Sequence, residues 1–386
     1  MRVCGIVAEY NPFHTGHLYH LQETRRVLGE DTVLVCAMSG NFVQRGDFAV
    51  LEKYARAETA IRCGADLVVE LPLSAALSSA EGFALGAIQT LHALGCDSVS
   101  FGAETSDITL LCRAADGLRR LRRVGISGGS SYAAQRQAAL QTIDPEAATL
   151  LSFPNNTLGI AYCQFARPLG MQVFAVPRQG AGHDETAPQG GFVSASYLRE
   201  RLRGNQWEEC VPYLPEAVWN VLQRARQYGQ APVCLPEEEL FYLVQRLSFT
   251  RELYTGTADG FDERLQKAIA FASSWRDIVT RAQTRRFPAA RIRRALLRAV
   301  LTLTPDTSVT PSYIRIIALG QRGRNCIKRA TLPVIVKPAT EKIMATTLQP
   351  ALRRDAFADT FFTLAMPDKS QRAAGGHFRQ TPFIGW

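Results

Sequence analysis

The sequence predicts an α/β fold in which a doubly wound parallel sheet is followed by a mainly helical, basic region. The first 200 or so residues alternate short apolar, β-branched runs with segments of helical periodicity. Beyond about residue 205 strand-like runs become scarce, and positive charge accumulates. Alternation of strands and helices places helices on both faces of a sheet, which buries it and makes its strands parallel.

The strands and helices of the first half follow from these two patterns. The predicted strands are Val3–Ala8, Thr32–Met38, Leu67–Leu71, Ser98–Phe101 and Gln172–Val176. The predicted helices are His17–Leu28, Leu51–Cys63, Ala80–Leu94, Leu110–Leu121, Ser131–Ile143 and Thr157–Ala166.

The second half is predicted to be mainly helical. Its predicted helices are Leu240–Ser248, Gly260–Ser274, Trp275–Arg281 and Arg291–Leu303. Little resembles a strand before Leu332–Val336, and Gly375 to Trp386 is predicted to be a loosely held tail. We therefore predict two domains, residues 1–205 and 206–386.

The amino-acid composition limits the classes of protein to which this chain can belong. The 386 residues are 46% hydrophobic and 20% charged, which suits packed cores and excludes wholesale disorder. The 9 cysteines form no CxxC pair and no Cys/His cluster with zinc-ligand spacing, so reduced thiols and no protein-held metal are predicted. The sequence shows no membrane-length apolar stretch and no signal-peptide layout at its start, which predicts a cytoplasmic location. Nothing in the sequence indicates a stable protein partner.

The charge of +9 is unevenly distributed. Residues 1–205 hold 18 basic and 19 acidic residues, whereas residues 264–329 hold 15 basic and 2 acidic ones. This excess of positive charge comes mostly from arginine. It favours a polyanionic partner, such as nucleic acid, over a basic surface that is merely solvated. The candidate contacts to an RNA backbone are Arg285, Arg286, Arg293 and Arg294.

A turn containing two histidines, His14-Thr15-Gly16-His17, follows the first predicted strand. In a doubly wound sheet, ligands bind at the carboxyl ends of the strands, and the first turn of a helix offers unpaired N–H groups to phosphate oxygens. His14 and His17 can both face one phosphate, and Gly16 allows close approach of the backbone. The alternative is a helix N-cap with two incidental histidines. The sequence lacks GxxxxGK[ST], and it lacks GxGxxG after its first strand.

A second segment, Val193 to Arg199 (VSASYLR), has the composition of a helix start. The hydroxyl of Ser196 and the guanidinium of Arg199 suit the phosphates of a leaving pyrophosphate. The alternative is an ordinary helix start with Ser194 or Ser196 as the N-cap. We take His14, His17, Ser196 and Arg199 as the catalytic candidates.

These two segments resemble the HxGH and ISSTxxR elements of the nucleotidyltransferase superfamily. A wider resemblance, to the bacterial tRNA(Met) cytidine acetate ligase family, spans most of the chain. The similar segments are Val7 to Tyr19 (VAEYNPFHTGHLY), Ser39 to Arg56 (SGNFVQRGDFAVLEKYAR), Gly64 to Pro72 (GADLVVELP), Pro154 to Gly159 (PNNTLG), Arg178, Thr284 to Arg294 and Tyr313 to Lys328. At His183-Asp184 the preceding Gly182 departs from the aromatic residue of the family pattern.

The resemblance implies that ATP, accompanied by Mg²⁺, activates acetate as acetyl-adenylate. The acetyl group then passes to N4 of the wobble cytidine of elongator tRNA(Met). The implied ATP-binding positions are Val7, Ala8, Glu9, Tyr10, Asn11, Pro12, Phe13, His14, Thr15, Gly16, His17, Leu18, Tyr19, His20, Gly102, Asn155 and Arg178. From their place after the second strand, Asn41, Gln44, Arg45 and Lys53 are expected to face the same crevice. There Arg45 or Lys53 would neutralise a phosphate or carboxylate, with a structural turn and a solvated helix as the alternative.

Two other functions compete with this hypothesis. An adenylyl- or cytidylyltransferase that makes a nucleotide cofactor would use the same motif, but it would leave the basic second half unexplained. A non-catalytic RNA-binding protein would account for the basic half, but it would not require intact His14, His17, Ser196 and Arg199.

Overall fold

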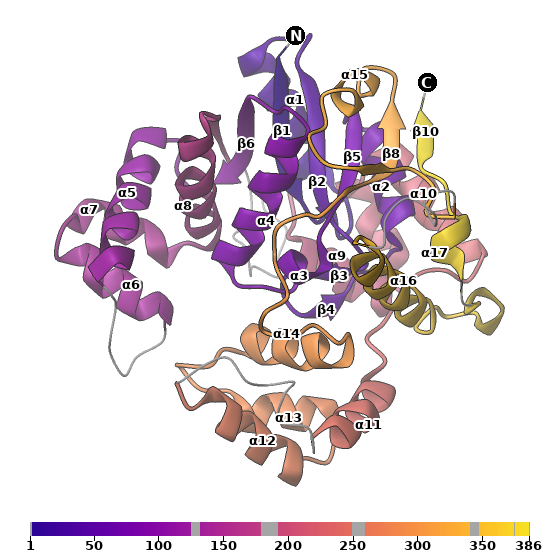
Figure 1. Cartoon of the computed structure of the whole chain (residues 1–386). Helices are drawn as coiled ribbons and strands as arrows, with labels where there is room; N and C mark the ends of the chain where they lie inside the picture. Colours follow the sequence, from indigo (N-terminus) through magenta and orange to yellow (C-terminus); the bar gives the residue numbers. More distant parts are fainter. Residues whose placement is uncertain are drawn as a thin grey trace.

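A mostly parallel sheet occupies the centre of the computed structural model, with a group of helices below it (Figure 1). The structure describes residues 2–124, 132–178, 192–248, 259–339, 347–373 and 375–385. Over these residues the sheet is 8-stranded, in the order β10-β8-β5-β2-β1-β6-β7 with β9 beside β8. The strands are β1 (Val3–Ala8), β2 (Val33–Ser39), β5 (Leu67–Leu71), β6 (Ser98–Ala103), β7 (Gln172–Pro177), β8 (Ile314–Gly320), β9 (Val334–Ile335) and β10 (Phe383–Gly385). All of the strands predicted in the first half are confirmed.

The connections of the sheet define where a ligand can bind. β1 pairs in parallel with β2 on one side and with β6 on the other. The chain therefore runs outward through β2 and β5, then returns to the other side of β1 and continues through β6 and β7. In a doubly wound sheet, ligands bind at this change of direction, beyond the carboxyl ends of the strands. The predicted fold class is confirmed.

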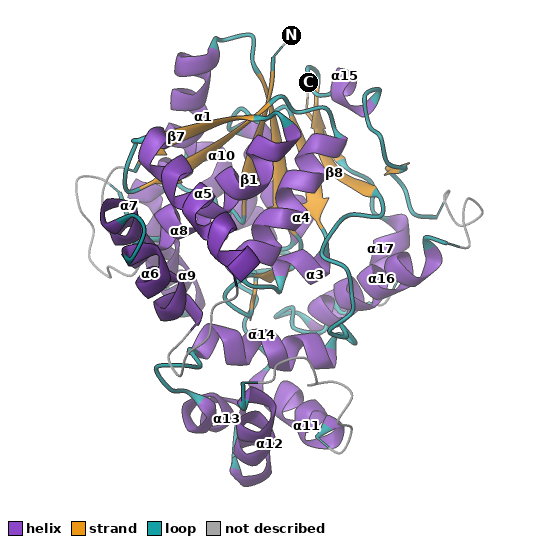
Figure 2. Ribbon diagram, turned by 60° about the vertical axis from the view of Figure 1, so that its left-hand side comes forward, coloured by secondary structure: helices purple, strands orange, loops and turns teal. Residues whose placement is uncertain are grey.

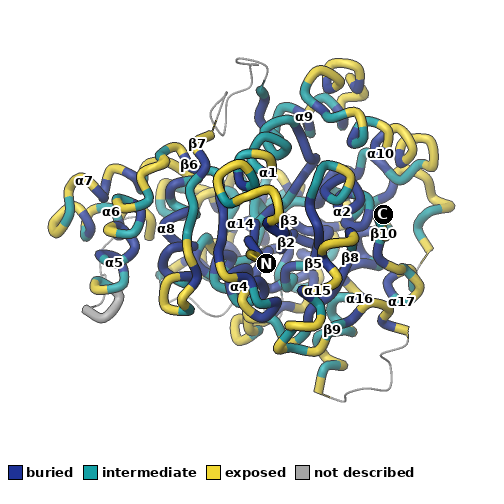
Figure 3. The backbone as a smooth tube through the Cα atoms, turned by 90° about the horizontal axis from the view of Figure 1, so that it is seen from above, coloured by how far each residue is buried: buried dark blue, intermediate teal, exposed yellow. Residues whose placement is uncertain are grey.

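Helices cover both faces of the sheet, as the alternation along β2 requires. Val33, Val35 and Ala37 pack with α4 (Ala80–Ala93), α5 (Ile108–Val124) and α8 (Pro154–Ala166). The intervening Leu34, Cys36 and Met38 pack with α1 (Thr15–Leu28), α2 (Lys53–Arg62), α9 (Ala195–Arg203) and α10 (Glu216–Gln227). Figure 3 shows the resulting buried centre between exposed outer helices. Helical crossovers make these strands parallel and cover both faces of the sheet, which explains why β2 is apolar on both sides.

A third core lies below the sheet, around α11 (Glu237–Leu247), α12 (Phe261–Phe271), α13 (Trp275–Ala282) and α14 (Ala289–Val300), as Figure 2 shows. A short hairpin of β3 (Phe42–Val43) and β4 (Asp47–Phe48) contributes to this core. The remaining helices are α3 (Leu73–Ala76), α6 (Tyr132–Gln141), α7 (Pro145–Thr149), α15 (Arg324–Ile327), α16 (Gln349–Thr363) and α17 (Gly376–Arg379). Within the described ranges, no helix is both long and apolar enough to cross a membrane.

The second half is mainly helical as predicted, with α10 and α16 in addition to the predicted helices, and it differs from the prediction at β8 and at the C-terminal segment. Residues 314–320 form β8, antiparallel to β5, although little strand was predicted before Leu332–Val336. The predicted loose tail is also wrong, because α17 packs against α16 and β10 pairs with β8. The boundary proposed at residue 205 therefore separates segments that share one sheet.

A buried ion cluster attaches the end of the chain to the sheet. The Lys53 side chain is fully buried, and its Nζ lies 2.8 Å from both carboxylate oxygens of Glu70 and 2.5 Å from Asp359 Oδ2. Asp359 on α16 also accepts a hydrogen bond from the Asn41 side chain and pairs with His377 on α17. Lys53 therefore neutralises protein carboxylates, and the hypothesis that it neutralises a ligand is wrong.

We predict that Lys53→Met destabilises the protein by roughly 3–5 kcal/mol, because removing one partner leaves buried carboxylates uncompensated. The free energy of unfolding in urea measures the effect. Arg62→Ala is the control in the same helix. The Arg62 side chain pairs with Glu58 and is 46% exposed. Such an exposed ion pair contributes about 1 kcal/mol or less to the free energy of unfolding. Equal losses for the two variants would contradict the role assigned to Lys53.

Candidate active site

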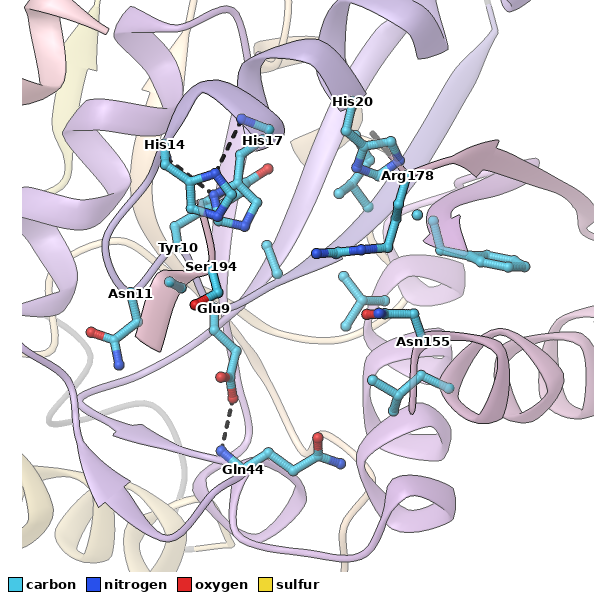
Figure 4. A pocket seen from close by; sticks show the side chains of 18 of the residues that line it. Glu9, Tyr10, Asn11, His14, His17, His20, Gln44, Asn155, Arg178 and Ser194 are labelled. Atoms are coloured by element: carbon cyan, nitrogen blue, oxygen red, sulfur yellow. Dashed lines mark hydrogen bonds between the residues drawn. The ribbon is translucent and has the colours of Figure 1, made fainter. Parts of the chain in front are cut away.

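A cavity of about 250 Å³ lies at the carboxyl ends of β1, β6 and β7. The starts of α1 and α9 and the β3–β4 hairpin complete its walls (Figure 4). The predicted residues that line it are Val7, Ala8, Glu9, Tyr10, Asn11, His14, Gly16, His17, Tyr19, His20, Gly102, Asn155, Arg178, Ser196 and Arg199. Pro12, Phe13, Thr15 and Leu18 are not among the described residues of this lining. Phe13 instead packs behind it, with its ring centre 4.7 Å from that of Tyr10.

The two histidines of the first motif form a reciprocal helix cap. The Gly16 N–H donates to His14 Nδ1 at 3.1 Å, and the His14 N–H donates to His17 Nδ1 at 3.2 Å. His14 is thus the N-cap of α1, so the alternative interpretation of this segment describes its local geometry correctly. Because each Nδ1 accepts, the proton of each neutral ring is on Nε2. Both rings line the cavity, and their centres lie 3.8 Å apart. Their Nε2–H groups can therefore donate to a ligand in the cavity.

Burial keeps these imidazoles neutral. Burial, together with the charges of Arg178 and Arg199, lowers the pKa of His14 to about 3. Burial, followed by the neighbouring His14, holds the pKa of His17 well below its ordinary value. The pKa of His20 falls to about 4 for the same main reason, and its Nε2 lies 3.0 Å from Ser100 Oγ. At neutral pH, His14 and His17 can therefore stabilise developing charge by hydrogen bonding, without giving up a proton.

The start of α9 supplies a second group of donors. Ser194 is its N-cap, with Oγ accepting from the Tyr197 N–H at 3.2 Å. One turn into the helix, Arg199 donates to Ser196 Oγ at 2.9 Å and to the Asn11 carbonyl at 2.8 Å. Burial lowers the pKa of Arg199 to about 10, so the guanidinium stays charged at neutral pH. A helix N-terminus beside such a cation is suited to phosphate oxygens.

The third side of the cavity is formed by the ends of β6 and β7. The Arg178 N–H donates to the Ala103 carbonyl at 2.9 Å, and Figure 4 shows its side chain directed into the cavity. A Cβ on Gly102 would lie 3.4 Å from Arg178 Cγ, so glycine leaves room beside this arginine. Asn155, at the start of α8, donates through Nδ2 to Glu104 Oε1 at 2.7 Å.

Some lining residues were missed from the sequence. Phe83 on α4 and Tyr162 on α8 contribute aromatic walls, and Asp47 adds a carboxylate from the hairpin. Phe83 and Tyr162 occupy ordinary buried positions of helices, so no sequence signal distinguished them from core residues. Gln44 and Arg45, expected to face the crevice, do line it, whereas Asn41 is buried against Asp359. His183 and Asp184 lie outside the described residues.

The candidate RNA contacts fall into two groups. Arg285 and Arg286 lie between α13 and α14, and Arg285 is exposed. Arg293 and Arg294 lie on α14 and donate to backbone carbonyls of the β3–β4 hairpin. Among the described residues, no group of three or more His, Cys, Asp or Glu is placed to hold a metal ion.

Comparison with known proteins identifies the family. Residues 1–376 match the HIGH Nucleotidyl Transferase family. A tRNA(Met) cytidine acetate ligase from Caldanaerobacter subterraneus is 33% identical, over 95% of this chain and 96% of the relative. The chain belongs to the tRNA(Met) cytidine acetate ligase family. Another member, from Syntrophotalea carbinolica, is 38% identical over 87% of this chain and 84% of its own.

The structures of this family agree with the fold described above. The crystal structure of Thermotoga maritima TmcAL bound with alpha-thio ATP has a TM-score of 0.88 and 30% identity. It covers 100% of this chain and 99% of the Thermotoga maritima chain. The apo structure of the same protein has a TM-score of 0.89 and 31% identity, with the same coverage. The resemblance to the tRNA(Met) cytidine acetate ligase family is therefore confirmed along the whole chain.

We predict that His14 and His17 remain neutral, protonated on Nε2, throughout pH 5–8, because burial lowers both pKa values far below this range. ¹⁵N spectra of histidine-labelled protein measure the tautomer directly, with His14→Gln and His17→Gln assigning the signals. An inflection near the ordinary histidine pKa of about 6.5 in either signal would contradict the assignment.

Proposed function

We propose that this protein acetylates a tRNA in two steps, using ATP to activate acetate. An acetate oxygen attacks the α-phosphorus of ATP, the bond to the bridging β-phosphate oxygen breaks, and pyrophosphate leaves. The N4 amine of the wobble cytidine of elongator tRNA(Met) then attacks the acetyl carbon. The acyl–phosphate bond breaks, AMP leaves, and the nitrogen gives up a proton. The observation that carries the proposal is that His14 and His17, each accepting a backbone N–H at Nδ1, line the cavity together with three arginines.

The first step is supported by the positions of these donors. His14 and His17 are fixed by the cap, so they can donate to the charge that develops at the α-phosphate without reorganising. Arg199 and Ser196, at the start of α9, would hold the leaving pyrophosphate. Arg178 approaches from the opposite side, where it would neutralise another phosphate. Binding both reactants in this one cavity orients the carboxylate for in-line attack.

Mg²⁺ would enter this reaction with the nucleotide. The described residues offer no cluster of three or more His, Cys, Asp or Glu for a resident ion. Arginines and backbone N–H groups dominate the phosphate-facing walls, and such donors bind anions directly. Mg²⁺ is therefore assigned to the ATP phosphates, and the roles given to the residues above do not depend on it.

The second step requires that a folded tRNA reach this cavity. The first part of the basic segment 264–329, up to the end of α14, belongs to the helical region on the hairpin side of the cavity, and Arg285 and Arg286 are its proposed tRNA contacts. Such contacts would hold the backbone, while an unstacked cytidine enters the cavity. ATP and tRNA are both cytoplasmic, and we propose that the enzyme acts there. A cofactor-making nucleotidyltransferase would have no use for this basic region.

We predict that His14→Ala and His17→Ala each reduce acetate-dependent ATP–pyrophosphate exchange roughly a hundred- to a thousand-fold, the usual cost of losing one fixed donor to developing charge. His92→Ala is the control, because His92 is an exposed histidine at the end of α4. Circular dichroism checks that each variant is folded. Near-normal ATP–pyrophosphate exchange in both variants would contradict the roles proposed for His14 and His17.

We predict that Arg285→Ala combined with Arg286→Ala weakens tRNA binding, because both arginines lie in the loop before α14, where Arg285 is exposed and Arg286 is half-buried. Each lost phosphate contact should reduce the slope of log K against log salt by about one. Binding of elongator tRNA(Met) at several salt concentrations measures the slope. An unchanged affinity and slope would place the tRNA contacts elsewhere.

A further inference from the structure

The β3–β4 hairpin belongs both to the cavity wall and to the core of the helical region. Val43, Gln44, Arg45 and Asp47 line the cavity. Two of these residues contact other parts of the wall: the Gln44 N–H donates to Glu9 Oε1 at 2.7 Å, and Arg45 Nη1 lies 3.4 Å from Ser196 Oγ. The hairpin therefore connects the end of β1 with the start of α9.

The opposite side of the hairpin is buried among the helices. Phe42 and Phe48 are at most 1% exposed and belong to the same core as α11 to α14. The Phe48 ring is stacked on that of Phe362 on α16, with centres 5.7 Å apart. A hairpin with strands this short cannot hold its own conformation, because an isolated two-stranded hairpin is marginally stable at best in water. Its shape must therefore be imposed by its neighbours.

Helix α14 makes the closest of these contacts at the hairpin tip. Arg294 Nη1 donates to the Gln44 carbonyl at 2.8 Å, and Arg293 Nε donates to the Arg45 carbonyl at 3.1 Å. Gly46 completes the tip with a φ of +71°. A Cβ at Gly46 would lie 2.6 Å from the Arg294 nitrogen and 2.7 Å from Arg293 Cβ, so the hairpin backbone rests directly on the helix.

Arg203 on α9 holds the hairpin from the other side. It donates to the Asp47 carboxylate at 3.0 Å and to the Phe48 carbonyl at 3.0 Å. The hairpin is thus clamped between α9, whose start faces the cavity, and α14, which belongs to the basic segment. Burial lowers the pKa of Arg294 to about 10, with Arg291, Arg293 and Arg298 adding to the effect. A partly desolvated guanidinium of this kind is stabilised by the carbonyl it contacts.

We propose that Arg293 and Arg294 are positioning residues for the ATP cavity: they hold the backbone of Gln44 and Arg45, and so connect the basic helical region to the site of adenylate formation. The inference deepens the proposed function and rests on it in one respect, the assignment of ATP and acetate to this cavity. Both arginines carried a different expectation from the sequence, contact with tRNA. The two roles differ experimentally, because adenylate formation requires no tRNA.

The test measures two properties in the absence of tRNA: the affinity for ATP by calorimetry, and kcat/KM for acetate-dependent ATP–pyrophosphate exchange. We expect Arg294→Ala to weaken ATP binding and to lower kcat/KM by roughly ten- to a hundred-fold, since about 1 Å of misplacement costs up to the larger value. Arg293→Ala should act in the same direction. Arg294→Lys keeps a donor within reach of the Gln44 carbonyl and should restore most of the loss.

Gly46→Ala disrupts the same contact without removing a charge, because its Cβ would displace the hairpin from α14. It should reproduce the Arg294→Ala phenotype. Its control is Gly260→Ala, which has a similar φ of +78° but nothing within 4 Å of the added Cβ. The control for a lost arginine is Arg276→Ala on α13, where the side chain is 82% exposed. Melting temperatures of all variants separate a local effect from general destabilisation.

Reduced ATP affinity and exchange in Arg294→Ala and Gly46→Ala, with both controls near wild type, would support the proposal. If both variants keep wild-type ATP affinity and exchange and lose only tRNA affinity, the proposal is overturned. Equal losses of ATP affinity and exchange in the controls would also overturn it. If Gly46→Ala does not fold, Arg294→Ala and its lysine rescue decide the outcome. If the wild-type protein shows no acetate-dependent exchange, the proposed function fails, and the ATP affinities still decide whether these arginines position the cavity.

Discussion

The site depends on two backbone-to-imidazole hydrogen bonds at the start of α1. The N–H groups of Gly16 and His14 occupy the Nδ1 atoms of His14 and His17. This cap satisfies donors that a helix start leaves unpaired, and it also determines the ring tautomer. On each ring, the Nε2–H edge is then left for a ligand in the cavity. The cap at the start of the helix also orients the two rings, so the N-cap interpretation of this motif and its proposed ligand-binding role do not exclude each other.

Features that depend on neighbours in the chain were predictable from the sequence. Apolar runs identified the strands around the site, and the two motifs identified the starts of α1 and α9. β8 was not predicted, because Arg315 interrupts its apolar run. That side chain is nevertheless 2% exposed and donates to the Tyr54 hydroxyl at 2.6 Å. A charged residue in a strand becomes understandable only when its partner, distant in sequence, is known.

The same reason explains the errors at single residues. Lys53 lies between segments that face the cavity, and nothing near it in sequence indicates its pairing with Asp359, which is 306 residues away. The C-terminal segment appeared loose because His377 meets Asp359 only in the folded chain. Conversely, the excess of arginine in the basic segment was read as exposed charge. Arg291 pairs with Asp259, and Arg298 donates to the carbonyl of Ser74, so part of that charge serves internal contacts.

A two-step reaction of this kind places opposing demands on the wall formed by the β3–β4 hairpin. An acyl-adenylate is open to hydrolysis, so the cavity must exclude water while the intermediate waits. The second substrate, a cytidine in a large RNA, must nevertheless reach the acetyl carbon. The hairpin wall takes its conformation from α9 on one side and α14 on the other. Since α14 belongs to the basic segment, any force that the tRNA exerts on this helix would reach Gln44 and Arg45 through two hydrogen bonds. If tRNA contacts α14, coupling through these bonds is reciprocal, so each of the two ligands would change the affinity for the other by the same factor.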